Sequence, residues 1–184
     1  MNRRELLTKA GVAAVGLSAI ATQAKAHTPG TTALYASWIH GTAFNAEDQN
    51  AINGVVRFGW GANFRGKPGS FTWFHVAVPT PVITDNIRIE LEKVFVFYKT
   101  THCVIKSVHL YDGPTKFKSI DNLSLSGDRS NGIVATNTWS VSPLRPMAWG
   151  LGISLGVQFS VGIDSPINPE LLFTTAGADF KVKR

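Results

Sequence analysis

Residues 149–164 read WGLGISLGVQFSVGID, and they alternate strictly between two kinds of side chain. One set is entirely apolar: Trp149, Leu151, Ile153, Leu155, Val157, Phe159, Val161 and Ile163. The set between them is small or polar. Successive side chains of a β-strand point to opposite faces, whereas a helix would spread the apolar set around its whole circumference. The stretch therefore predicts a central strand with one buried face and one bare face, against which something must lie close.

Two catalytic-looking motifs fall inside this stretch. Gly152-Ile153-Ser154-Leu155-Gly156 matches the Gly-x-Ser-x-Gly of a hydrolase nucleophile, and its glycines resemble a dinucleotide-binding loop. The first motif needs a sharp strand-to-helix turn, and the second needs a helix that follows at once. Because the alternation continues through both, we expect no catalytic residue here.

The rest of the chain predicts further strands and no convincing amphipathic helix after residue 26. Short strands are expected with turns every 8–14 residues, Gly61 to Gly69 as a turn-rich loop, and Gly177 as a bulge or kink between two final strands. The last strand should pair back towards the beginning of the domain. The expected fold is all-β, a single-domain antiparallel β-sandwich of jelly-roll-like form over residues 34–184, after a lead-in at 27–33.

The first 26 residues have the three zones of a bacterial export signal. A basic head with Arg3 and Arg4 is followed by a short, mildly apolar run, and Ala24-Lys25-Ala26 forms a small-x-small cleavage site. The arginine pair favours the twin-arginine route over general secretion. The apolar run is too short for a stable membrane anchor, which takes roughly 20 residues. We expect an exported protein, periplasmic or extracellular.

Charge and cysteine content exclude several classes of function. Without residues 1–26 the chain keeps 14 basic and 11 acidic residues, a net charge of +3. The only basic cluster is Lys181-Val182-Lys183-Arg184, so nucleic acid is not an expected partner. The single cysteine, Cys103, allows no intramolecular disulfide and is expected in the core, on the same strand face as Ser107 and His109.

Aromatic residues and strand ends supply the candidate ligand site. Tryptophans exposed on a sandwich stack on sugar rings or other apolar ligand surfaces. Trp60, between two glycines and beside a glycine-rich loop, is the best of the five tryptophans for exposure. His40 and Asp112, at the ends of expected strands, are candidates for the same rim.

A copper site is the alternative. Cleavage after Ala26 would make His27 the first residue, and its amino group and ring nitrogen could chelate copper in a histidine brace. His40, His75, His102 and His109 are candidate partners, although His75 and His109 are each more typical of a histidine in a sheet.

Several segments together resemble a family of small exported bacterial β-rich proteins classed as a domain of unknown function. They are Trp38 to Gly41, Gly59 to Gly69, Trp73 to Ile83, Val108 to Gly113, Leu151 to Ser154 and Phe173 to Phe180. The resemblance covers nearly all of the chain after residue 26 and implies a single β-rich domain. It implies no activity or catalytic residue.

These observations favour an exported, non-catalytic binding protein whose ligand is a carbohydrate or another cell-envelope component. A copper-dependent redox protein or copper carrier is the first alternative. A structural or self-associating envelope protein is the second. The sequence leaves the oligomeric state open.

Overall fold

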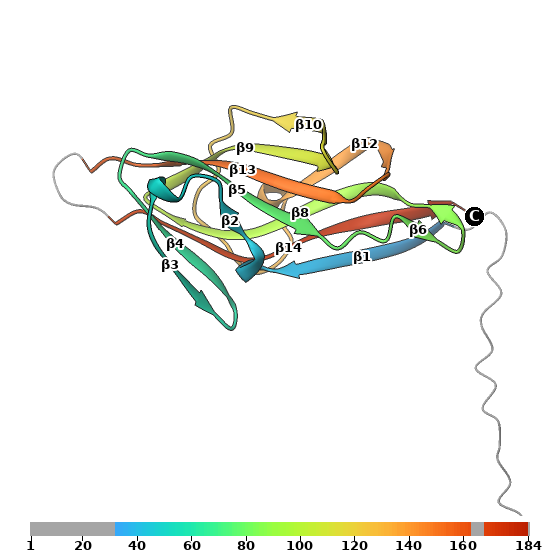
Figure 1. The fold of residues 1–184 in the computed structure, drawn as a ribbon, viewed down its shortest axis with the longest axis horizontal. Coiled ribbons are helices and arrows are strands. Elements are labelled where there is room, and N and C mark those ends of the chain that lie inside the picture. The colour runs from blue at the N-terminus through green and yellow to red at the C-terminus, as the bar shows by residue number, and fades with distance from the viewer. Residues whose placement is uncertain (1–31, 163–167, 184) are drawn as a thin grey trace, which may run out of the picture.

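The computed structural model describes residues 32–162 and 168–183, which form two stacked antiparallel sheets (Figure 1). The seven-stranded sheet contains β1 (Thr32–His40), β3 (Ile52–Phe58), β4 (Gly61–Gly66), β8 (Glu90–Thr101), β11 (Asp128–Arg129), β12 (Thr138–Pro146) and β14 (Glu170–Lys183). The five-stranded sheet contains β2 (Asn45–Ala46), β5 (Phe71–Val78), β9 (Cys103–Asp112), β10 (Thr115–Ile120) and β13 (Leu151–Phe159). A short hairpin, β6 (Ile83–Thr84) and β7 (Ile87–Arg88), and three 3₁₀ turns, η1 (Gly41–Ala43), η2 (Gln49–Ala51) and η3 (Ala135–Asn137), complete the described chain.

The strand order is that of a jelly roll, as the sequence predicts. In one sheet β4, β14, β8 and β12 are neighbours in that order, and in the other β5, β13, β9 and β10. The chain crosses between the sheets at almost every connection, and only β9 and β10 form a hairpin within this set. The last strand, β14, pairs with the first, β1, which confirms the expected return to the beginning of the domain.

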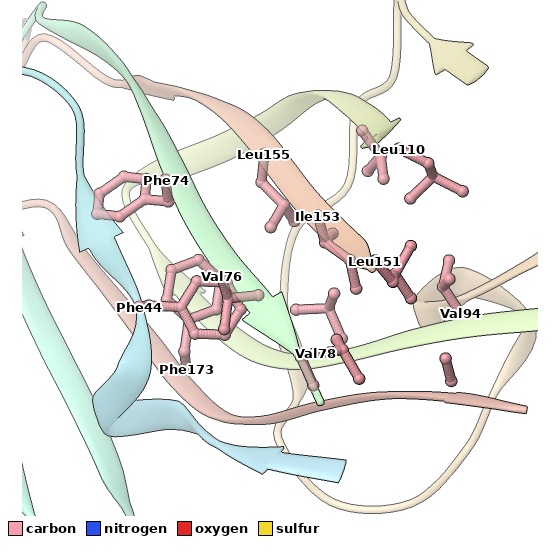
Figure 2. Packing of buried hydrophobic residues seen from close by; sticks show 14 of the residues in the cluster. Phe44, Phe74, Val76, Val78, Val94, Leu110, Leu151, Ile153, Leu155 and Phe173 are labelled. Atoms are coloured by element: carbon pink, nitrogen blue, oxygen red, sulfur yellow. The ribbon is translucent and has the colours of Figure 1, made fainter. Parts of the chain in front are cut away.

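β13 is the central strand of its sheet, paired with β5 on one side and β9 on the other. Leu151, Ile153, Leu155, Val157 and Phe159 are buried, and they meet the inner face of the opposite sheet. Figure 2 shows Leu151, Ile153 and Leu155 in the same layer as Phe173 of β14 and Val94 of β8. The alternation predicted from the sequence therefore makes one half of the core.

The strand is shorter than its alternating pattern. Trp149 is 75% exposed and Val161 is also exposed, although both belong to the apolar set. The backbone N–H groups of Ala148, Trp149 and Gly150 donate to the carboxylate of Asp112, so they are not available to a neighbouring strand. β13 begins at Leu151 for that reason.

Two other local predictions are wrong, and one strand lacks a local sequence signal. Gly61 to Gly66, expected as loop, is strand β4. Residues 115–120 show no strand pattern in the sequence but form β10. The two expected final strands are one continuous strand, β14, and Gly177 pairs with Trp38 and Phe95 in register. Its irregularities lie elsewhere, near residues 174 and 179. Pairing with neighbours that are distant in the sequence overrides the weak strand propensity of glycine here.

The N-terminal predictions fall mostly outside the described residues. Arg3, Arg4, Ala24, Ala26 and His27 all lie there. β1 begins at Thr32, two residues before the expected start of the domain at residue 34. Within the described ranges, no helix is long and apolar enough to cross a membrane.

Candidate functional site

A row of polar side chains crosses the outer face of the five-stranded sheet. Strand register places one residue from each strand in this line, which we call the polar row: Asn45 of β2, His75 of β5, Ser154 of β13, His109 of β9 and Ser119 of β10. Adjacent strands lie roughly 4.8 Å apart, so five strands give a row about 19 Å long. The row is as wide as the sheet itself.

His75 is held between two partners. Its Nε2 lies 2.8 Å from a carboxylate oxygen of Glu47, and its Nδ1 lies 2.8 Å from Oγ of Ser154. A carboxylate only accepts, so Nε2 carries the hydrogen, and in the neutral ring Nδ1 accepts from the serine hydroxyl. The pair of hydrogen bonds fixes both the tautomer and the orientation of the imidazole.

The chain Glu47–His75–Ser154 has the residue types of a hydrolase triad but lacks two of its requirements. Ser154 is 6% exposed, so its hydroxyl is poorly placed to reach a substrate. It also lies inside a straight central strand, where the ladders with β5 and β9 engage the neighbouring backbone N–H groups. No such group remains to stabilise an oxyanion. These three hydrogen-bonded residues are suited to holding one another's side chains in place.

His109 occupies the matching position on the other side of Ser154. Its Nε2 donates to a carboxylate oxygen of Asp121 at 2.8 Å. Hydrogen bonds from the Ser107 hydroxyl and from His109 lower the pKa of Asp121 below its usual value. Asp121 is therefore ionised at neutral pH and accepts from both side chains, which orients the His109 ring.

The Trp73 side chain reaches across β13, from β5 to β9. Its indole lies 4.5 Å from the His109 ring, centroid to centroid, although Trp73 is on β5 and His109 is on β9. The strand between them presents Gly156, where an added Cβ would stand 3.2 Å from Trp73 and 2.9 Å from Phe71. At Gly156 the bare face of β13 is thus covered by aromatic side chains of the neighbouring strand, as expected, whereas nothing lies within 4 Å of a Cβ at Gly150.

An open hollow of about 650 Å³ lies on the opposite side of the polar row from Trp73. Its lining includes Asn45, His75 and Ser154 from the row, with Gly152 and Tyr111 from the next register line. The face therefore combines aromatic rings, a line of hydrogen-bonding groups and a shallow hollow.

The sequence-predicted ligand residues lie at three separate places. Trp60 is in the turn between β3 and β4 and is 56% exposed, but Trp149 is more exposed, so the expectation that Trp60 is the most exposed of the five tryptophans is wrong. His40 ends β1, where its Nδ1 faces the hydroxyl and the backbone N–H of Thr42. Asp112 ends β9 on the other sheet. The structure does not join them into one rim.

Asp112 faces the backbone instead of the solvent. It is 1% exposed, and its carboxylate accepts the three N–H groups that precede β13. Burial alone would raise its pKa, but those hydrogen bonds, with Arg145 nearby, hold the pKa below its usual value. Asp112 stays ionised and anchors this loop.

The candidate copper residues that the structure describes are not grouped into a metal site. His27 is outside the described residues, and the Nε2 atoms of His75 and His109 each face a carboxylate. Across residues 32–162 and 168–183, no three His, Cys, Asp or Glu side chains are grouped so that they could hold a metal ion.

Sequence reasoning missed most of the polar row. Asn45 and Ser119 lie in segments with no strand signal, and the sequence singles out Ser154 only within a motif for which no catalytic role is expected. In β9 a bulge near Lys106 changes which side chains share a face, so Cys103 points into the core while Ser107 and His109 face outwards. That corrects the expectation that all three share one face. A usable signal was present in Phe71, Trp73 and His75, which alternate on one strand.

Fold and face together define a jelly-roll β-sandwich with one aromatic and polar outer sheet face. The chain belongs to a family of unknown function, DUF6623, whose sequence profile matches residues 33–169. No protein with a curated description matches it. One solved structure with which it aligns is a low-affinity xylan-binding module, CBM86, from the gut symbiont Roseburia intestinalis. The alignment covers 84% of this chain and 97% of the module, at 11% identity and a TM-score of 0.39, which carries no inference about the ligand.

Proposed function

We propose that the protein is an exported, non-catalytic binding protein that holds a carbohydrate on the outer face of its five-stranded sheet. The observation that carries this proposal is the position of Trp73, laid across Gly156 beside the polar row. A sugar ring has an apolar face and a polar rim. An aromatic side chain packs against the first, while amide, hydroxyl and imidazole groups bind the second.

The shape of the site favours a polymer. The polar row and the hollow lie on an open sheet face, so a ligand can extend beyond the site in both directions. The two imidazoles are each fixed by a carboxylate, which reduces the conformational entropy lost on binding. Export through the signal at residues 1–26 would bring the protein to cell-envelope or extracellular polysaccharides.

Affinity electrophoresis tests the proposal. The exported protein is run in native gels that contain arabinoxylan, mixed-linkage β-glucan, galactomannan or dextran, and retardation is compared with a gel without polymer. We expect retardation by at least one polymer, and a Trp73→Ala variant should bind that polymer about tenfold more weakly, equivalent to ~1.4 kcal/mol of lost stacking.

Ile83→Ala is the matched control, because Ile83 is exposed in the β6–β7 hairpin, away from this face. It should be retarded like the parent protein. Absence of retardation by any neutral polymer, or full retardation of Trp73→Ala, would contradict the proposed site. Mass spectrometry of the exported protein tests the expected start at His27.

A further inference from the structure

The β3–β4 hairpin carries a second exposed aromatic group. Phe58 ends β3 and Trp60 lies in the tight turn that follows, and their rings are parallel, with centroids 4.7 Å apart and planes 1° apart. Phe58 covers one face of the indole, yet Trp60 remains 56% exposed. The hairpin projects from the body of the sandwich (Figure 1). A rigid indole with open surface is thereby presented to the solvent.

Beside Trp60 lies a hollow of about 190 Å³. Its floor is a register line across three strands, Asn63 of β4, Leu172 of β14 and Lys99 of β8. Thr101 and Glu170 belong to the next line and complete the lining. These residues belong to the seven-stranded sheet, so the hollow and the polar row lie on opposite faces of the sandwich.

The charges around this hollow are balanced. Glu170 accepts from the Asn63 amide at 3.0 Å and pairs with Arg65 at 3.4 Å. The Lys99 ammonium pairs with Asp128 at 3.3 Å. Each cation has an acidic partner, so the hollow favours a neutral ligand over a charged one. An amide, a hydroxyl and a carboxylate next to an open indole match the polar rim and apolar face of a neutral sugar.

We propose that this hollow is a second sugar-binding site, and that the protein binds two polysaccharide chains at once, one on each face. The second site takes its ligand class from the proposed function but uses none of the same residues. Two sites on opposite faces of one rigid sandwich cannot easily bind the same stretch of polymer. The consequence is that the protein cross-links neutral polysaccharides.

The test uses the exported protein and the polysaccharide panel described above, with two readouts. Affinity electrophoresis measures binding, and dynamic light scattering of dilute polymer measures cross-linking. The parent protein should be retarded in the gel, and it should increase the apparent particle size of the dilute polymer in light scattering. Trp60→Ala should lose at most about threefold in affinity, because one site remains. It should fail to cross-link, because cross-linking needs both sites. Trp60→Tyr should restore cross-linking, since it keeps an aromatic face, and Ile83→Ala should behave as the parent.

The variants separate this inference from the proposed function. If Trp73→Ala abolishes binding and Trp60→Ala retains both retardation and cross-linking, the second site is wrong and the first stands. If Trp60→Ala abolishes binding while Trp73→Ala does not, the hollow beside Trp60 is a binding site and the proposed site on the five-stranded sheet is wrong. Absence of binding by the parent protein to every polymer overturns both. Circular dichroism checks that each variant is folded.

Discussion

Trp73 lies so close to Gly156 that a Cβ at the glycine would stand 3.2 Å from the indole. The two residues are register partners on β5 and β13, and the missing side chain lets the indole reach His109 on the next strand. The other sheet repeats this relationship: Trp38 lies over Gly177 of β14 and stacks on Phe95 of β8, with centroids 5.3 Å apart. In each sheet, a glycine in the central strand sets the position of a tryptophan.

Gly156→Val should displace Trp73 and Phe71 without unfolding the protein. The atoms nearest to the new Cβ are the ends of these two side chains, which can move more cheaply than backbone. We expect a stability loss of about 1–3 kcal/mol, a changed near-ultraviolet circular dichroism spectrum and weaker retardation by polysaccharide, as for Trp73→Ala. Gly54→Val is the control, since nothing lies within 4 Å of a Cβ there. Unchanged polysaccharide binding by Gly156→Val would show that the ligand site does not depend on the position of Trp73.

Gly41→Ala should cost more stability than any exposed glycine substitution. A Cβ at Gly41 would lie 2.1 Å from the carbonyl oxygen of Phe173, in the backbone of the central strand β14. Moving that strand disturbs its ladders and the stacked Phe44–Phe173 pair. We expect a loss at the upper end of about 1–3 kcal/mol in urea denaturation, with Gly54→Ala nearly neutral. Equal midpoints for the two variants would refute this reason for the glycine.

Asp112→Asn should weaken the acid sensitivity of the fold. The folded pKa of Asp112 is lowered, so its carboxylate stabilises the native state above the unfolded pKa of about 3.9. That contribution is lost as pH falls through the lower folded value. At neutral pH the variant should be less stable by about 1–3 kcal/mol, because an amide replaces an acceptor of three N–H groups. Denaturation midpoints of the parent protein and the variant, measured from pH 7 to pH 2, check both the loss of stability and the weaker acid sensitivity. The same dependence of the midpoint on pH in the two proteins would contradict the lowered pKa of Asp112.

Cys103 should be inert in the folded protein. Burial raises the pKa of its thiol to about 12, and Sγ donates to the carbonyl oxygen of Glu170 at 3.1 Å. At pH 8 the thiolate is almost absent and the sulfur is inaccessible, so labelling by an aromatic disulfide should require unfolding. The labelling rate in increasing urea should then follow the loss of circular dichroism. Rapid labelling without denaturant would show that β9 opens locally.

Much of the fold is visible in single strands. The residues of β5 and β13 separate buried from outer side chains by simple alternation, and the last strand pairs with the first as expected. Errors occur where a partner strand supplies what the local sequence lacks. β4 is rich in glycine, and β10 lacks an apolar alternation, yet both are held by paired neighbours. A carboxylate distant in the sequence, Asp112, makes β13 begin at Leu151, two residues after its alternating pattern begins at Trp149.

The sequence by itself determined an all-β sandwich, its central strand and the absence of a nucleophile turn at Ser154, because the period of two in a strand is a local property. Only the tertiary structure decided that His75, Ser154 and His109 stand in one line, and that Trp73 reaches across Gly156. Register between strands depends on contacts between residues far apart in the chain. A single bulge in β9 reverses which side chains face outwards, and no local pattern records it.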